Sequence, residues 1–231
     1  MSEGKTIPFV RVPGHDHAAV GYAVDCGASI VVPQVDTVAQ AKHVVSAAKF
    51  GTKYNGTRSA PPFRLIPGLT DKVLDASMKG GLHENLNHQA AIIIQIESLE
   101  GINNLDDILT EVPDIDAVWI GSLDARVSMN MPANMQGPHD EPEWQEALAK
   151  YKATMRKHDK PMANFAMGPH AKMMGQGLAF NMCASDVAAL MGLQGALKEG
   201  RAMFGKLTRE DGFGHGSEKK QEGKGGQNGK V

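Results

Sequence analysis

The chain is expected to fold as an α/β protein built on a parallel sheet. Two short β-branched runs, 92–96 and 117–120, are apolar at nearly every position, which is typical of strands buried on both faces. Segments with helical character separate these runs from the other apolar runs, so strands and helices alternate along the chain. A parallel sheet needs such a helix as the crossover between neighbouring strands.

Six strands are predicted, at residues 9–12, 29–35, 91–96, 117–120, 162–166 and 179–183. Helices are predicted at residues 16–26, 37–49, around Met78, 98–109, 143–158 and 186–204. Gly27 can end the first helix, and Thr37 and Ser98 can cap the helices that follow them. Two segments rich in glycine, proline or methionine, 51–71 and 127–142, are predicted to be loops, and a loop as long as the first is usually functional or disordered.

Length and composition indicate one domain, assigned to residues 1–207 of the 231. Glycine and charged residues dominate the end of the chain, so 208–231 is predicted to be a disordered tail. The net charge of −2 gives no electrostatic argument for binding nucleic acid or an anionic membrane. No signal segment or membrane span is recognisable, which makes the cytoplasm the expected location. Cys26 and Cys183 lack metal-type spacing and are predicted to be reduced core residues.

Each of the two clearest strands leads into a carboxylate. Glu97 directly follows the run 92–96, and Asp124 comes shortly after 117–120. The carboxyl ends of parallel strands carry the chemistry in barrel and doubly wound folds, and two carboxylates suit a hard divalent cation that keeps positions for water or substrate. In the alternative interpretation, Glu97 caps the next helix and Asp124 opens a turn, and spacing alone does not decide between the two.

Short motifs around both carboxylates carry a resemblance to a known family. They are Gln-Ile-Glu-Ser at 95–98, Gly101, Asn-Leu at 104–105, Ile-Asp at 115–116, Trp-Ile-Gly at 119–121 and Asp124. In these motifs the chain resembles the HpcH/HpaI aldolase/citrate lyase family, from about Phe9 to about Phe204. The segments 56–63 and 67–71 are closer to the macrophomate synthase branch. The resemblance implies a TIM (β/α)8 barrel of the phosphoenolpyruvate/pyruvate-domain superfamily.

On that family the six predicted strands match strands 3–8 of the barrel, so the first two would lie upstream of Met1. The family's loop after the second strand carries an Asp-His acid/base pair that has no match here. We therefore interpret the chain as an N-terminally truncated member. His15 and His17 follow the first predicted strand and are the available substitutes for the base, although loop histidines are more often merely solvated.

The resemblance also assigns the metal and catalytic residues. Glu97 and Asp124 match the family's metal-binding carboxylates, which implies Mg²⁺, or Mn²⁺ or Co²⁺, as the cofactor. Arg11 matches the arginine that hydrogen-bonds the enolate oxygen, a role that suits a permanently charged guanidinium, and its alternative is an ion pair that braces the barrel end. Gln95 matches a glutamine beside the metal and shares a strand face with Glu97.

Three more residues are expected to contact the substrate. Backbone amides at Leu123 and Asp124, beside Gly121, would hold its carboxylate. Arg58, in the long loop, would face an acidic substrate or lie on the surface.

The expected reaction is cleavage of a 4-hydroxy-2-oxo acid to pyruvate and an aldehyde through a metal-stabilised enolate, with oxaloacetate decarboxylation beside it. Two alternatives stay open. In the first, the chain is a non-catalytic paralogue that either acts as an oligomer partner or is inactive. In the second, it is a citrate-lyase-like or macrophomate-synthase-like enzyme. The sequence shows no basic cluster for the phosphates of a coenzyme A thioester. A homo-oligomer acting on a small oxo acid is expected.

Overall fold

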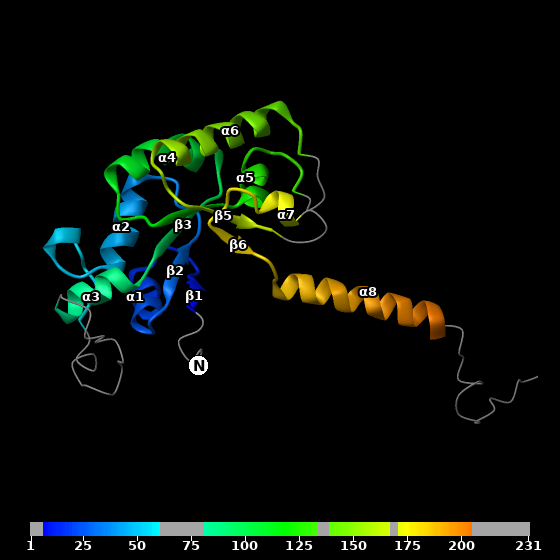
Figure 1. Cartoon of the computed structure of the whole chain (residues 1–231), viewed down its shortest axis with the longest axis horizontal. Helices are drawn as coiled ribbons and strands as arrows, with labels where there is room; N and C mark the ends of the chain where they lie inside the picture. Colours follow the sequence, from blue (N-terminus) through cyan, green and yellow to red (C-terminus); the bar gives the residue numbers. More distant parts are fainter. Residues whose placement is uncertain (1–6, 61–80, 134–138, 167–170, 205–231) are drawn as a thin grey trace, which may run out of the picture. The chain divides into compact units, whose positions relative to one another are not determined.

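The computed structural model describes residues 7–60, 81–133, 139–166 and 171–204. By its internal contacts the chain divides into two units, Met1–Cys183 and Ala184–Val231. The first unit is built on a sheet of six strands: β1 (Phe9–Arg11), β2 (Ser29–Val32), β3 (Ile92–Ile96), β4 (Ala117–Ile120), β5 (Met162–Phe165) and β6 (Phe180–Met182). The strands lie in sequence order and every neighbouring pair is parallel (Figure 1). The predicted α/β class with a parallel sheet is confirmed, and the order is the one that β/α barrels have.

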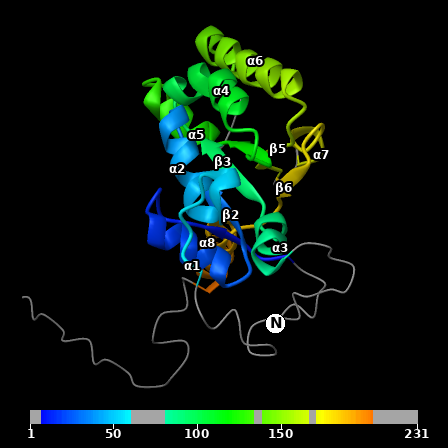
Figure 2. The ribbon, with the colours of Figure 1, turned by 90° about the vertical axis from the view of Figure 1, so that its left-hand side faces the viewer.

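The helices of this unit are α1 (His17–Asp25), α2 (Val38–Ala48), the 3-10 turn η1 (Thr52–Tyr54), α3 (Leu82–Gln89), α4 (Leu99–Glu111), α5 (Ser122–Ser128), α6 (Pro142–Lys157) and α7 (Ala171–Met174). Helices α4 and α6 lie side by side along the sheet (Figures 1 and 2). The predictions of α1, α2, α4 and α6 are confirmed to within about two residues. Helices α5 and α7 were not predicted, and the helix expected around Met78 lies outside the described residues.

Side-chain caps fix where the helices begin. The Asp16 carboxylate accepts a hydrogen bond from the backbone N–H of Ala19 (2.8 Å). Thr37 and Gln40 form a reciprocal capping box, and the Ser98 hydroxyl accepts from the N–H of Gly101 (2.8 Å). The predicted caps at Thr37 and Ser98 are confirmed, so the start of α4 is set by the residue that follows Glu97.

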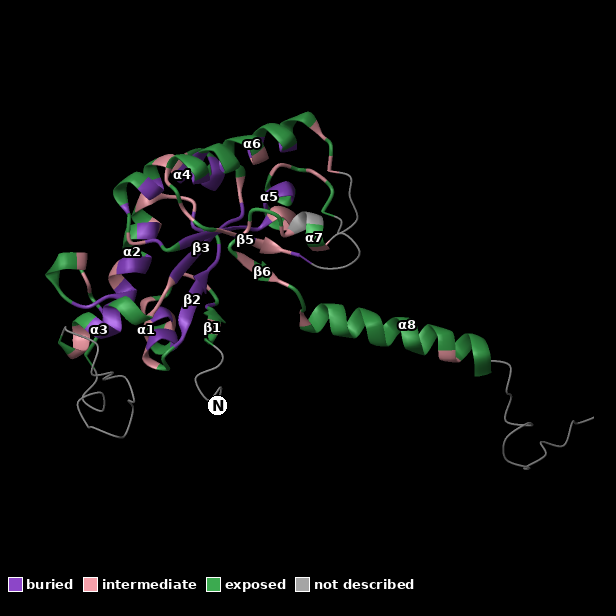
Figure 3. Cartoon of the chain, in the orientation of Figure 1, coloured by how far each residue is buried: buried purple, intermediate pink, exposed green. Residues whose placement is uncertain are grey.

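The two faces of the sheet bury different sets of side chains. One face packs under the helices, where the alternate isoleucines of β3, Ile92, Ile94 and Ile96, are fully buried. The other face carries a smaller cluster of Val31, Ile93, Ala117, Trp119 and Ala163. Burial on both faces explains why these strands read as continuous apolar runs (Figure 3).

An aromatic contact joins the first strand to the last. The rings of Phe9 on β1 and Phe180 on β6 are 5.1 Å apart between centroids, although β1 and β6 are not paired. Trp119 lies between them and Phe165, with centroid separations of 5.9 Å to Phe180 and 5.6 Å to Phe165. These spacings are typical of favourable aromatic pairs. Because residues of the two edge strands meet in this cluster, the sheet must curl around it as a barrel wall does.

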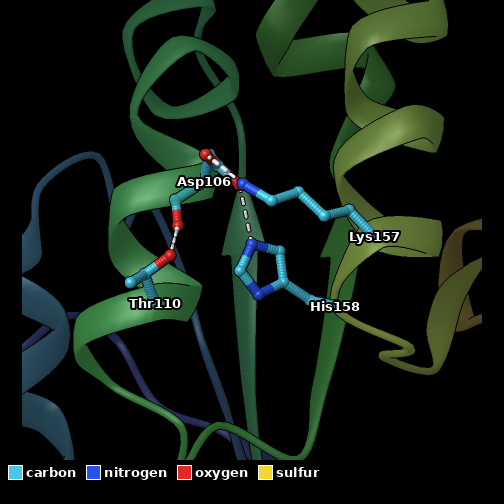
Figure 4. Close-up of polar contacts among 4 residues, drawn as sticks. All are labelled: Asp106, Thr110, Lys157 and His158. Atoms are coloured by element: carbon cyan, nitrogen blue, oxygen red, sulfur yellow. Dashed lines mark hydrogen bonds and ion pairs between the residues drawn. The ribbon is translucent and has the colours of Figure 1, made fainter.

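A polar cluster ties α4 to α6 on the outer surface. The carboxylate of Asp106 accepts hydrogen bonds from the Nζ of Lys157 (2.6 Å) and the Nε2 of His158 (2.7 Å), as Figure 4 shows. The Thr110 hydroxyl donates to the backbone carbonyl of Asp106 (2.7 Å). Hydrogen bonds from Lys157 and then His158 hold the pKa of Asp106 below its usual range. Solvent reaches these groups, so the cluster adds little to stability.

A buried arginine anchors α5. The Arg126 side chain is 1% exposed, and its two terminal nitrogens donate to the two oxygens of Glu141 (2.8 and 2.6 Å). Its Nε donates to the Pro132 carbonyl (3.1 Å), and its guanidinium lies over the Trp144 ring. The hydrogen bonds from Arg126 lower the pKa of Glu141 to about 2. The chain between α5 and α6 is thereby pinned at both ends.

Replacing Glu141 by glutamine should lower the melting temperature by roughly 5 °C or more, since a buried guanidinium loses its charged partner. Because the folded-state pKa is depressed from 4.5 to about 2, the contribution of Glu141 is complete above about pH 5 and is lost as the pH falls towards 2. Thermal melts of both proteins between pH 7 and 2 should therefore converge at the acid end.

Glu143→Gln, at an exposed position in the first turn of α6, is the matched control and should melt as the wild type does. A constant difference between Glu141→Gln and wild type across the pH range would contradict the predicted role of the ion pair.

The second unit contains helix α8 (Asp186–Phe204), which has the predicted bounds. The Ser185 hydroxyl accepts from the N–H of Ala188 (3.1 Å) and so caps its start. Within its own unit, α8 has no buried side chain (Figure 3). The predicted tail, 208–231, and its boundary with the domain 1–207 lie outside the described residues.

Two further predictions concern the chain as a whole. No helix among the described residues is both long and apolar enough to cross a bilayer. The prediction that both cysteines lie in the core is wrong: Cys26 and Cys183 are exposed. Cys26 follows the last residue of α1, and Cys183 follows the edge strand β6, so neither is covered by a neighbouring element.

Candidate functional site

Three of the predicted site residues lie at the carboxyl ends of the strands. Arg11 is the last residue of β1, Glu97 follows β3, and Gly121 follows β4. The Nε of Arg11 donates to the side-chain oxygen of Gln95 (3.3 Å), which links the end of β1 to β3. Gln95 is 9% exposed, and its alternation along β3 places it on the inner face that also carries Ile93.

The Glu97 carboxylate is buried, with 7% of the residue exposed. Its Oε2 accepts a hydrogen bond from the backbone N–H of Gln34 (2.9 Å). Its other side lies against Gly121, where an added Cβ would be 2.5 Å from Cγ and 2.6 Å from Oε1. Glycine is therefore the residue that leaves room for this carboxylate.

Burial raises the pKa of Glu97 above its usual range, and the negative charges of Asp124 and Asp36 raise it further. The N–H of Gln34 and the positive charge of Arg11 act in the opposite direction. The charges of Arg11 and Asp124 thus both act on Glu97. The structure therefore places Arg11, Glu97 and Asp124, which the sequence predicts as site residues, near one another.

Asp124 lies in the first turn of α5 with its side chain exposed. The helix begins at Ser122 after Gly121, and no side chain caps it. Its first backbone N–H groups, which include that of Leu123, have no partner within the helix. These are the amides that the sequence assigned to the substrate carboxylate.

The donor set fits a hard divalent cation. Glu97 and Asp124 contribute carboxylate oxygens, the ligands that Mg²⁺ and Mn²⁺ prefer. Burial and the nearby charge of Asp124 disfavour the ionised form of Glu97, and a bound cation would stabilise that form. In the described parts of the chain no three acidic, histidine or cysteine side chains cluster as a metal cage, so two carboxylates are what the site offers.

The structure does not bring Arg58 to this site. Its buried guanidinium pairs with Asp25 at the end of α1 (2.7 Å) and lies 4.4 Å above the Phe50 ring. It also donates to the Ala48 carbonyl, the last residue of α2. Helices α1 and α2 run antiparallel to the strands. Their C-terminal ends therefore lie near the N-terminal ends of the strands, whereas Glu97 lies at the opposite ends. Arg58 connects α1 to α2, and neither the substrate role nor the surface position applies.

The two candidate histidines lie in different places. The Nε2 of His15 is 2.7 Å from the Pro33 carbonyl, in the turn that also contains Gln34. The Nε2 of His17 is 3.1 Å from the Thr57 carbonyl and 3.0 Å from its hydroxyl. Of the two, His15 is the one hydrogen-bonded to the turn at Pro33 and Gln34, which contacts Glu97.

The turn after β2 is the part of the site that the sequence did not reveal. Gln34 has a positive φ of 51°. Positive φ is usual for glycine and tolerated by asparagine and aspartate, but glutamine gives no such signal. Its backbone role at Glu97 was therefore not predictable from the residue type.

Comparison with known proteins now decides the family. The sequence model of HpcH/HpaI aldolase/citrate lyase matches residues 2–168, most of the chain and all of the candidate site. The chain belongs to the HpcH/HpaI aldolase/citrate lyase family. The resemblance seen in the motifs around Glu97 and Asp124 is thereby confirmed.

Two curated members of the HpcH/HpaI family illustrate the relationship. Hydroxypyruvate/pyruvate aldolase of Pseudomonas aeruginosa is 31% identical over 145 residues, which are 61% of this chain and 50% of that protein. The 2-keto-3-deoxy-L-rhamnonate aldolase of Escherichia coli strain K12 is 27% identical over 201 residues, 85% of this chain and 69% of that protein. The chain thus spans half the length of the first relative and about two thirds of the second.

Solved structures agree with the fold. Macrophomate synthase superposes with a TM-score of 0.73 at 27% identity, covering 90% of this chain and 70% of that one. An HpcH/HpaI family protein from Burkholderia cenocepacia J2315 gives 0.67 at 24% identity, covering 84% and 73%. The six parallel strands are therefore arranged as in other members of the HpcH/HpaI family.

Proposed function

We propose that this site cleaves a 4-hydroxy-2-oxo acid to pyruvate and an aldehyde in a reaction that depends on a divalent metal ion. The observation that carries the proposal is the buried Glu97 carboxylate, which lies at a strand end within the fields of Asp124 and Arg11. Two relatives whose names are those of 2-oxo acid aldolases support the substrate class. Oxaloacetate decarboxylation belongs to the same proposal, because it also passes through a pyruvate enolate.

Glu97 and Asp124 would hold the divalent ion, Mg²⁺, Mn²⁺ or Co²⁺. When bound, the ion would stabilise the negative charge of the pyruvate enolate. Arg11 donates hydrogen bonds to the same developing oxyanion, and Gln95 keeps its guanidinium in place by accepting the Nε–H. The amides of Leu123 and Asp124, in the first turn of α5 after Gly121, receive the substrate carboxylate.

Aldol cleavage also removes the proton of the hydroxyl group at the bond that breaks. His15 is the candidate for this base, because its ring is bonded to the turn that contacts Glu97. Decarboxylation of oxaloacetate needs no such base, since carbon dioxide leaves directly. General base catalysis is typically worth about 10²–10⁴-fold, so the two reactions report separately on the enolate site and on the base.

The test follows the enolate directly. In deuterated buffer with Mn²⁺ or Mg²⁺, the chain is expected to exchange the methyl protons of pyruvate, as measured by NMR, and EDTA should stop the exchange. Pyruvate release from a 4-hydroxy-2-oxo acid and from oxaloacetate is measured in parallel. Absence of exchange and of pyruvate release with every metal tested would refute the proposed function and favour the alternative, a non-catalytic partner subunit.

A further inference from the structure

The Glu97 carboxylate is held from two sides by backbone. On one side the N–H of Gln34 donates to Oε2 (2.9 Å). On the other side Oε1 packs against Gly121, so closely that a Cβ added to Gly121 would be 2.6 Å from this oxygen. Among the described residues no hydrogen bond involves Oε1. The protein thus donates a hydrogen bond to one oxygen of the carboxylate and, among the described residues, none to the other.

The N–H of Gln34 points at Glu97, and Gln34 has a left-handed backbone with φ of 51°. The φ of a residue fixes the direction of its N–H relative to the chain that follows, so a negative φ would not combine this bond with the same position of Val35. The next residue returns to the sheet, where the N–H of Val35 donates to the Gln95 carbonyl (3.0 Å). The unusual conformation is confined to a single residue of this turn, and it lets the N–H groups of Gln34 and Val35 reach Glu97 and Gln95 together.

The surrounding turn is fixed on both sides of Gln34. The Pro33 carbonyl contacts the His15 ring (2.7 Å), and the Asp36 carbonyl accepts from the Asn104 amide (2.8 Å). The Ser98 hydroxyl donates to the Asp36 carboxylate, which ties the turn to the start of α4. A strained residue persists when its neighbours determine its conformation in this way, and such residues cluster at functional sites.

We propose that Gln34 is a positioning residue of the metal site: its left-handed backbone lets its N–H hold Oε2 of Glu97 while Val35 stays bonded to Gln95, so that Oε1 is presented as the ligand. The inference rests on the proposed function, because it assigns a task within that site. It concerns the backbone of residue 34, so it predicts which substitutions keep the site and which disrupt it. The glutamine side chain itself is exposed and has no part in the positioning.

The experiment compares substitutions that differ in their tolerance of positive φ. Glycine adopts this conformation freely and keeps the N–H, whereas a β-branched residue strongly disfavours it. Binding of Mn²⁺ alone, measured by electron paramagnetic resonance, should be within about twofold of wild type in Gln34→Gly. It should be roughly tenfold weaker in Gln34→Val, the size expected for losing a hydrogen bond to a charged group.

The matched control is Asn55→Val, which places the same side chain on another left-handed residue with φ of 46° in the turn after η1. It should lose as much thermal stability as Gln34→Val and bind Mn²⁺ as the wild type does. Unchanged affinity in Gln34→Val, equal losses in Gln34→Gly and Gln34→Val, or an equal loss in the Asn55 control would each overturn the positioning role.

A measurement without metal separates this inference from the proposed function. In the metal-free chain the amide hydrogen of Gln34 should exchange with solvent about tenfold more slowly in wild type than in Glu97→Ala. Equal exchange rates would overturn the positioning role. If Glu97→Ala and Asp124→Ala bind Mn²⁺ as tightly as wild type while the Gln34 amide is protected, the proposed metal site fails and the hydrogen bond stands.

Discussion

Replacing Glu97 by glutamine is expected to slow the exchange of pyruvate methyl protons by about 10²-fold or more. The amide has nearly the shape of the carboxylate and can still accept the N–H of Gln34, so the change removes charge and little else. Without that charge the site loses one of its two anionic oxygen donors. NMR exchange rates at saturating Mn²⁺, together with the Mn²⁺ affinity, are the measurements.

Glu97→Gln should also fold at least as stably as wild type in metal-free buffer near neutral pH. Burial and nearby carboxylates raise the folded-state pKa of Glu97, so ionising it as the pH rises costs folding stability. Glu100→Gln, at an exposed position in the first turn of α4, is the matched control and should exchange pyruvate protons as wild type does. A Glu97→Gln protein with wild-type exchange would show that this carboxylate is not a ligand.

Gly121→Ala is expected to have an effect of comparable size through packing alone. The added methyl group would lie 2.5 Å from Cγ and 2.6 Å from Oε1 of Glu97, distances that side chains do not tolerate. Either the carboxylate moves or the turn between β4 and α5 shifts and carries Asp124 with it. A displacement of about 1 Å is enough to cost roughly 10²-fold in rate. Pyruvate exchange, Mn²⁺ affinity and the melting temperature together describe the loss.

The control for this substitution is Gly14→Ala, where the new methyl group meets no atom within 4 Å. It should leave exchange, affinity and melting temperature unchanged. Wild-type exchange in Gly121→Ala would mean that the position of Glu97 beside β4 is not required, and the two-carboxylate site would have to be abandoned.

The buried strands and their terminal carboxylates were predictable because both depend on short stretches of sequence. The runs at 92–96 and 117–120 are apolar on both faces, and Glu97 follows the first run directly. The seven-residue helix α5 was missed because so short a helix shows little periodicity, and Ser122 and Leu123 give no clear start signal. Local patterns therefore located the site but not the helix that carries Asp124.

Features that depend on distant residues escaped prediction. Arg58 was assigned to a substrate because its partner, Asp25, belongs to another element, and nothing near Arg58 in the sequence indicates burial. The left-handed conformation of Gln34 is imposed by Pro33, Asp36 and their contacts with His15, Ser98 and Asn104. The wrong placement of Arg58 and the missed conformation of Gln34 have one cause: tertiary contacts set the environment of a residue whose type suggests another.

The contact between Phe9 and Phe180 has a consequence for how the chain is synthesised and folds. Strand pairing joins neighbours along the chain, so the sheet can grow in the order in which its strands leave the ribosome. The aromatic cluster is completed only at the end of that order, since Phe180 belongs to β6. Until β6 emerges, Trp119 and Phe165 face solvent on an uncovered surface, which is a hazard for aggregation.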